Sequence, residues 1–512
     1  MSQPPASEGR PFDAALITPI TPVSSRELDV LELVADGLSN DGIAGRLFVS
    51  VKTVESSLRS IYLKLGLAED GRDRNRRVNA AMYVVSLRAR QPALSLGLEE
   101  LTETVASAPF DTVVTMLEEH AVRTESGAWR LYAAAAWYLA IVDDLDHALD
   151  LAGRASRDVG RSGAPPGVRA RSSIPTHRPV ARVIVDALTA MLEAMRGIRV
   201  LDHVLLDELA AFAALALRHP DREVFDGMEA VLEIANWFTF SDRAKDAAAI
   251  LGRRIYRTDT RDDFALLSAW ACQAELDIRR GRWRRCASAL EQMMQRGEAI
   301  GHSNAYGHVL SARLQAGRGD ITRTNTHLRA ARRAAMELGD HSTLWRADAA
   351  QGLLAIGVGD AHQAVVVLNQ VYRRTLANGL GLSSVRMWEA DLVEALIRTD
   401  DRPTAVTTTE WLRTDVDATG SGWGAATLSR CSGLIAVDPA QAVDHFDAST
   451  RAFGDLDAPF EQARSELLLG ESLQAVHGAD AARFRVARAQ ESFEMIGADP
   501  WAGRAADWLA RS

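Results

Sequence analysis

The sequence predicts an all-α protein with two parts, a small N-terminal domain of four short helices and a long array of helical repeats. Apolar residues recur three and four positions apart through most of the chain, which is the period of a helix with one buried face. Within residues 24–67 this pattern is interrupted twice by serines that suit helix N-caps. In the C-terminal part, a small residue recurs about every forty positions. We therefore expect an arm at 1–20, a first domain at 21–92 and a repeat domain at 96–512.

Composition restricts the class of protein. The 512 residues carry a net charge of −10, which argues against a protein that coats nucleic acid, so any DNA contact must be local. Two of the three lysines, Lys52 and Lys64, lie in the first domain. The three cysteines have no CxxC spacing and fit a reducing cytosol. No signal peptide and no membrane span is recognisable, so we expect a cytoplasmic protein without membrane contact.

The first domain contains two helix starts that can be read from single residues. Ser39 can cap a helix that begins near Asn40, and Ser50 can cap one that begins near Val51. Along this last helix the apolar positions are spaced by four, three and four residues and share one face, namely Val54, Leu58, Ile61 and Leu65. The opposite face is polar and weakly cationic. Such a helix fits the major groove of DNA.

These residues also carry a resemblance to a known family. The segments concerned are Ser25–Leu31 (SRELDVL), Gly37–Asn40 (GLSN), Ile43–Ser50 (IAGRLFVS), Lys52–Val54 (KTV) and Ile61–Gly66 (IYLKLG). Together they resemble the LuxR-type helix-turn-helix of transcriptional regulators. The resemblance implies double-stranded DNA as the partner, with the second helix across the backbone and the third in the groove.

The candidate DNA-binding residues fall into two groups. Phosphate contacts are expected from Ser39, Lys52, Thr53 and Lys64. Base contacts are expected from Glu55, Ser56 and Arg59, where Arg59 suits guanine and Glu55 suits the cytosine amino group. Glu55 has a second interpretation, an ion pair with Arg59 one turn along the helix and no DNA role. Both interpretations stay open on the sequence alone.

A fourth helix is expected from about Val78 to Arg88. In the family that this domain resembles, a helix at this place commonly supplies the dimer contact, and Val78, Met82 and Val85 form a suitable stripe. The same stripe could instead pack on the rest of the chain. Because one domain with so few cations should bind DNA weakly, we expect a homodimer that reads two half-sites.

The repeats are recognised from turn-like residues followed five positions later by a small residue that opens a second helix. These pairs are Asp143 and Ala148, Gly281 and Cys286, Gly319 and Thr324, Gly359 and Ala364, Asp400 and Ala405, and Val437 and Ala442, with a less regular unit at Gly478 to Ala482. A small residue at the crossing lets two helices approach closely, and stacked pairs bury each other's open face. The array resembles the tetratricopeptide class.

The end of the chain resembles the last repeats of the large ATP-binding LuxR-type regulators. The residues are Ala458–Arg464 (APFEQAR), Leu468–Gly470 (LLG), Phe493, Gly497–Ala502 (GADPWA) and Arg504–Ala505. In those proteins the helix-turn-helix follows the repeats, whereas here it precedes them. Their phosphate-binding loop GxxxxGK[ST] is absent, because no lysine of this chain follows a glycine. ATP-driven oligomerisation is therefore not expected.

The segment 160–179 interrupts the helical pattern of the sequence. Its prolines, glycines and serines exclude a regular helix, and three arginines make it basic. It is either a solvated loop between helical blocks or an element that becomes ordered on binding ligand or DNA.

Two hypotheses remain for the repeat domain. It either senses a small-molecule effector in a concave groove, or it is a protein-interaction scaffold. The groove would have aromatic walls from Trp270, Tyr306, Trp345, Trp388 and Trp423. RNA polymerase is a further candidate partner of such a regulator. We find no HExxH or GxSxG motif, and the sequence predicts no enzyme activity, no cofactor and no metal site.

Overall fold

The computed structural model confirms the all-α class, with helices throughout its described part and no strand there. The chain divides into two compact units, Met1–Leu96 and Gly97–Ser512. The structure describes residues 27, 30–31, 33–34, 38–47, 49–64, 109–123, 128, 131–133, 135–136, 139, 144–161, 180–197, 204–210, 229–255, 263–300, 302 and 304–511. The expected arm at 1–20, the fourth helix at 78–88 and residues 162–179 of the Pro-rich segment lie outside these ranges.

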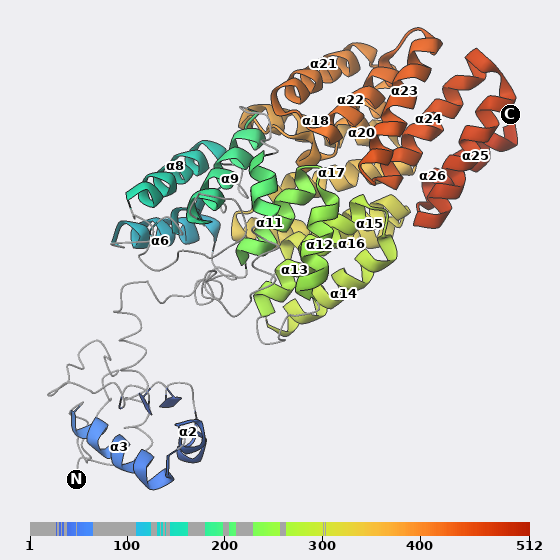
Figure 1. Ribbon diagram of the computed structural model, residues 1–512. Helices are drawn as coiled ribbons and strands as arrows, with labels where there is room; N and C mark the ends of the chain where they lie inside the picture. Colours follow the sequence, from blue (N-terminus) through green and yellow to red (C-terminus); the bar gives the residue numbers. More distant parts are fainter. Residues whose placement is uncertain are drawn as a thin grey trace, which may run out of the picture. The chain divides into compact units, whose positions relative to one another are not determined.

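In the first unit, α2 spans Asn40–Leu47 and α3 spans Val51–Lys64 (Figure 1). Residues 27, 30–31 and 33–34 are also helical. One small hydrophobic core joins all three segments, because their apolar faces meet. Its buried members are Val30, Leu31, Val34, Ile43, Ala44, Val54, Leu58 and Ile61.

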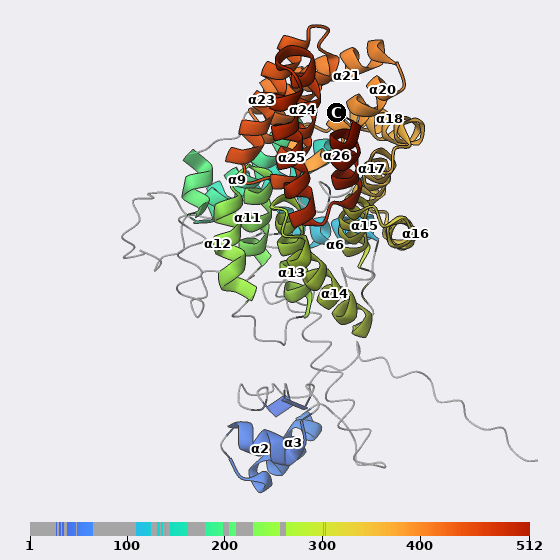
Figure 2. The same ribbon diagram turned by 90° about the vertical axis from the view of Figure 1, so that its right-hand side faces the viewer.

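The described part of the second unit is a succession of helices, and from α15 to α26 short turns join them (Figures 1 and 2). The described helices are α6 (Phe110–Arg123), α8 (Leu145–Arg161), α9 (Val180–Met195), α11 (Glu229–Phe240), α12 (Ala244–Ile255), α13 (Asp263–Arg279), α14 (Trp283–Ala299), α15 (Ala305–Arg318), α16 (Ile321–Leu338), α17 (His341–Gly357), α18 (Ala361–Asn378), α19 (Ser383–Arg386), α20 (Glu389–Arg398), α21 (Arg402–Thr419), α22 (Gly422–Ile435), α23 (Pro439–Asp455), α24 (Pro459–His477), α25 (Ala479–Ile496) and α26 (Asp499–Arg511). Most of them pack against the next helix in sequence.

Two-residue signals set the turns inside these helix pairs. Gly319 ends α15 with a φ of +77°, and Asp320 then caps α16 by accepting a hydrogen bond from the amide of Arg323. Gly359 and Asp360 repeat this arrangement before α18, with a φ of +87° at the glycine. The left-handed conformation is easy for glycine, and aspartate is a good N-cap. The local sequence therefore fixes both the end of one helix and the start of the next.

The small residues predicted at the helix crossings are buried in every described pair. Ala148, Cys286, Thr324, Ala364, Ala405, Ala442 and Ala482 are all at most 7% exposed. The burial that the sequence predicts for these small residues is confirmed.

The last helices pack against helices from the middle of the chain. α26 contacts α15, and a Cβ added at Gly319 would lie 2.4 Å from Cγ of Pro500. The carboxylate of Asp242 accepts hydrogen bonds from the amides of Gly422 and Trp423 at the start of α22, at 2.7 and 3.2 Å. Helices from the middle of the array are thus in contact with its C-terminal helices, and side chains between the two become buried.

Candidate functional site

The orientation of α3 is set by the stripe of apolar residues that it buries in the core of the first unit. Val54 and Ile61 are fully buried and Leu58 is 5% exposed, as the sequence predicts. Leu65, the fourth member of the expected stripe, lies outside the described residues. Because these apolar side chains fix the rotation of α3, the polar side of the helix must face away from the core.

Both expected N-caps are formed. The hydroxyl of Ser39 accepts a hydrogen bond from the amide of Gly42 at 3.2 Å, and that of Ser50 accepts one from the amide of Thr53 at 3.1 Å. The hydroxyls of Ser50 and Thr53 also lie 2.7 Å apart and share a hydrogen bond. These caps begin α2 and α3 where the sequence predicts. They place Ser39 and Thr53 at helix N-termini, where backbone amides favour anionic groups such as phosphate.

The three residues expected to read bases share one exposed surface with Lys52, which is expected to contact phosphate. Lys52, Glu55, Ser56 and Arg59 are all exposed. Glu55 and Arg59 form no ion pair within 4.0 Å in the described part of the chain, so the alternative pairing considered for Glu55 is not formed. We call these four side chains the outer face of α3. They are free to meet a partner.

Lys64 has a partner inside the first unit. Its ammonium lies 2.6 Å from the carboxylate of Glu27, which also accepts a hydrogen bond from the hydroxyl of Ser60 at 2.8 Å. This half-buried contact ties the first helical segment to the end of α3. The structure therefore separates Lys64 from the outer face of α3 and gives it a stabilising contact. Sequence reasoning missed Glu27, because the two residues lie 37 positions apart.

A capped helix lying before a second helix with a free polar face defines a helix-turn-helix DNA-binding domain. Residues 21–71 match the family described as bacterial regulatory proteins, luxR family, so this segment is a LuxR-type helix-turn-helix domain.

The matches to relatives cover this segment. Mb0914c of Mycobacterium bovis, named as an HTH-type transcriptional regulator, is 60% identical over 42 residues, which are 8% of this chain and 5% of that protein. Rv0890c of Mycobacterium tuberculosis, named in the same way, is 58% identical over 41 residues, 8% of this chain and 5% of its own. The oxygen regulatory protein NreC of Staphylococcus aureus is 53% identical over 49 residues, 10% of this chain and 23% of its own. The chain thus covers less than a quarter of each of these proteins.

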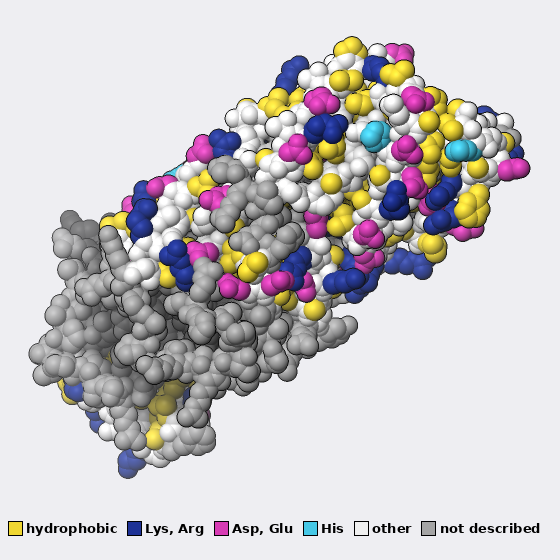
Figure 3. Space-filling view, turned by 45° about the horizontal axis from the view of Figure 1, so that its top comes forward, with side chains coloured by type: hydrophobic (Ala, Val, Ile, Leu, Met, Phe, Trp, Pro, Cys, Tyr) yellow, Lys and Arg dark blue, Asp and Glu magenta, His cyan; other side chains and the backbone are white. Residues whose placement is uncertain are grey.

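The surface of the second unit has mixed charge. On the face that Figure 3 presents, acidic and basic side chains are interspersed. Within the described residues, no helix combines the length and the apolarity that crossing a bilayer requires.

The aromatic residues expected to wall a groove are separated by the fold. Trp388 is 1% exposed and stacks on Trp411, so it belongs to a hydrophobic core. Trp270 also packs against the main core and is partly buried. Tyr306, Trp345 and Trp423 instead contact charged side chains in the interior: Tyr306 donates to the carboxylate of Glu275, and the two tryptophans lie beneath arginines.

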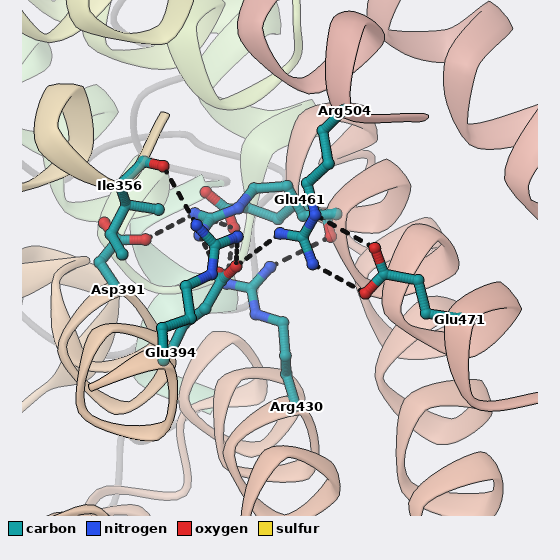
Figure 4. Close-up of polar contacts among 9 residues, drawn as sticks. Ile356, Asp391, Glu394, Arg430, Glu461, Glu471 and Arg504 are labelled. Carbon is teal, nitrogen blue, oxygen red and sulfur yellow. Dashed lines mark hydrogen bonds and ion pairs between the residues drawn. The ribbon is translucent and has the colours of Figure 1, made fainter. Parts of the chain in front are cut away.

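The interior also holds a network of ion pairs that sequence reasoning did not find (Figure 4). Arg464 pairs with Asp391 at 2.7 Å and with Glu394 at 3.0 Å, and Arg504 bridges Glu394 and Glu471. We call this set of residues the interior ion network. Its members are Asp391, Glu394, Arg398, Arg430, Glu461, Arg464, Glu471 and Arg504. It contains four arginines and four carboxylates, so its charges balance. A signal was present in the motif APFEQAR, whose Glu461 and Arg464 stand one turn apart.

Proposed function

We propose that the protein is a transcriptional regulator without enzyme activity that binds operator DNA through the outer face of α3. The single observation behind this proposal is that Lys52, Glu55, Ser56 and Arg59 are exposed on the third helix of a LuxR-type domain. The names of the relatives support it, since they describe transcriptional regulators. The place of action would be the cytoplasm, with RNA polymerase as a further partner.

Base reading would come from Arg59 and Glu55, and the phosphate contacts from Lys52 and the N-termini of α2 and α3. One good bidentate pair contributes roughly 1–3 kcal/mol of discrimination between bases. So few cations support only weak binding by one domain, because affinity for DNA grows with the number of phosphates neutralised. We therefore propose that two copies bind as a dimer to half-sites about one helical turn, or a multiple of it, apart.

A gel-shift series with the full-length protein tests this function. The probe is the promoter beside the protein's own gene, titrated at several salt concentrations against random DNA of equal length. Specific binding should exceed binding to random DNA by at least about a thousandfold. Glu55→Ala should change which operator bases matter, whereas Lys52→Ala should weaken binding to all sequences alike and lower the salt slope by about one. Equal affinity for promoter and random DNA would refute the proposal.

We further propose that the second unit is a tetratricopeptide-like array that senses a small-molecule effector and alters operator binding. The Gly-Asp turns, the buried small residues at the crossings and the enclosed charged interior support a ligand-responsive array. Thermal melts against a metabolite panel test it, because a ligand at a hundred times its dissociation constant stabilises by about 2.7 kcal/mol.

The scaffold alternative has one observation in its favour. Phe484 and Met495 lie eleven positions apart on α25, which places them on one face, and they are 63% and 78% exposed. An exposed apolar pair on one helix face suits protein docking. If no small molecule raises the melting temperature while a stoichiometric protein is captured by the wild type and lost with Phe484→Ser, the scaffold function replaces the sensor function.

A further inference from the structure

We propose that the interior of the second unit binds a small organic anion with a flat apolar body, and that Arg313 and Arg346 hold its carboxylate. This proposal deepens the sensor function and depends on it for its biological meaning. It concerns a group of charged residues next to the interior ion network, the arginine cluster, which consists of Glu275, Arg279, Arg313 and Arg346.

The arginine cluster has more guanidinium groups than carboxylates. Glu275 pairs with Arg279 at 2.8 Å, and both side chains are buried. Burial alone would raise the pKa of Glu275, but Arg279, Arg346 and Arg313 together hold it below its usual range. Three cations thus act on this one carboxylate, while Asp391 and Glu461 of the interior ion network also attract Arg313. The neighbouring interior ion network has no spare carboxylate, because its four negative and four positive groups already pair.

Arg313 on α15 has almost no hydrogen-bond partner. Among the described residues, no carboxylate lies within 4.0 Å of its guanidinium, and its contact with the backbone oxygen of Met387 is long, at 3.5 Å. An arginine offers five N–H donors. A half-buried guanidinium with one weak contact is costly unless another acceptor, such as a carboxylate, comes to it.

Arg346 on α17 stands among aromatic rings. Its Cζ lies 4.9 Å from the ring centroid of Trp345, 5.6 Å from that of Tyr306 and 5.9 Å from that of Phe240. Within the described part of the chain its guanidinium has no carboxylate within 4.0 Å, and its buried Nε has no hydrogen-bond partner. The rings hold the cation in place but accept few hydrogen bonds, so its donors stay available. They also offer flat apolar walls to the body of a ligand.

A small cavity reaches Arg313 and marks where a ligand would enter. Its volume is about 10 Å³, room for about one water molecule. Arg279, Arg313 and Glu461 form its polar lining. The apolar lining is Ile278, Trp283, Leu353, Met387, Trp423 and Phe460. An organic anion therefore requires a neighbouring side chain to move.

Met387, at the end of the short helix α19, is the residue that a ligand would have to displace. The residues that flank α19, Leu382 and Met387, both have left-handed backbone conformations, with φ of 65° and 55°. Non-glycine residues seldom adopt this conformation, because it is strained. Met387 also lines the cavity and provides the carbonyl next to Arg313. A carboxylate that replaces this carbonyl would release Met387, while Arg386 of α19 stays paired with Glu389 and Asp415.

The test measures binding to the full-length chain in the absence of DNA. The probes are acetate, benzoate and indole-3-acetate, each compared with its neutral amide, and the readouts are the melting temperature and calorimetric titration. At least one aromatic carboxylate should raise the melting temperature of the wild type, and its amide should not. Arg313→Gln and Arg346→Gln should each weaken its binding by about tenfold to a hundredfold.

The ligand-free variants provide a second readout. Both glutamine variants should still unfold cooperatively without ligand, so that lost probe binding reports the site and not a loss of structure. Arg346→Lys, which keeps the charge, should retain more binding than Arg346→Gln. Arg332→Gln is the matched control, because Arg332 is half-buried but already pairs with Asp348 at 2.7 Å, and its affinity for the probe should equal that of the wild type.

The proposal is overturned if no carboxylate stabilises the protein more than its amide, or if the wild type and both glutamine variants bind the probe equally. Operator binding is measured separately by gel shift. A wild type that binds none of the probes but binds its operator normally rejects the anion site alone. Probe binding without any specific operator binding rejects the regulator function and leaves the anion site standing.

Discussion

The outer face of α3 and the interior ion network use the same kinds of side chain in opposite settings. On α3, Glu55 and Arg59 are exposed and unpaired with each other, so water solvates both charges. In the network, Arg464 and Glu394 are at most 5% exposed and pair directly. Solvated charges contribute little to stability and stay available to a partner, whereas buried charges must satisfy one another. The position of a charge in the fold thus decides whether it recognises a partner or stabilises the protein.

The largest expected effect comes from breaking the interior ion network. Arg464→Leu leaves Asp391 and Glu394 buried without their shared cation, and should lower the free energy of unfolding by about 3–5 kcal/mol. The measurement is urea unfolding followed by tryptophan fluorescence, which reports the second unit because all 11 tryptophans lie there. The control is Arg451→Leu, since Arg451 is 73% exposed and its pair with Asp447 should matter little. Equal urea midpoints for the two variants would show that the network does not stabilise the unit.

The next effect concerns the contact that encloses the interior. Gly319→Ala and Gly339→Ala both place a Cβ on a residue with a left-handed backbone, with φ of +77° and +68°. Only at Gly319 does the Cβ meet another helix, at 2.4 Å from Cγ of Pro500, while nothing lies within 4 Å of the Cβ at Gly339. Gly319→Ala should therefore destabilise by about 1–3 kcal/mol more than Gly339→Ala. Equal melting temperatures for the two variants would mean that the α15–α26 contact is loose.

A smaller effect depends on pH. Burial, together with His327 and Arg333, lowers the pKa of His308 to about 4. In the unfolded chain a histidine titrates near pH 6.5. His308 therefore adds stability above that pH, and this contribution is lost as the pH falls from about 6.5 toward 4. His308→Gln should lessen the loss of melting temperature over this range, and His362→Gln, at an exposed position, should not. If the melting temperature falls with pH equally in both variants and the wild type, His308 is not the group responsible.

The smallest effect on stability is expected on the outer face of α3. Arg59→Ala should change the free energy of unfolding by less than about 0.5 kcal/mol, because the side chain is exposed. The same change should relax discrimination at one operator position by about 1–3 kcal/mol. Gel shifts with operators mutated one base pair at a time measure this. A uniform loss across all these operators would indicate a phosphate contact instead.

The sequence by itself determined the features that depend on nearby residues. The capping serines Ser39 and Ser50, the buried stripe of α3 and the Gly-Asp turns follow from side chains within a few positions of each other, which is the range over which helix signals act. The family of the N-terminal segment also follows from a continuous run of residues.

Only the tertiary structure decided which distant charges meet. Lys64 pairs with Glu27, Arg504 reaches Glu394 across 110 positions, and α26 covers α15. No local pattern specifies such contacts, because they arise when the chain packs its C-terminal helices onto its middle. Among the described residues, the same packing leaves Arg313 and Arg346 in the interior without a carboxylate within 4.0 Å, since burial and pairing are properties of the whole fold and not of any segment.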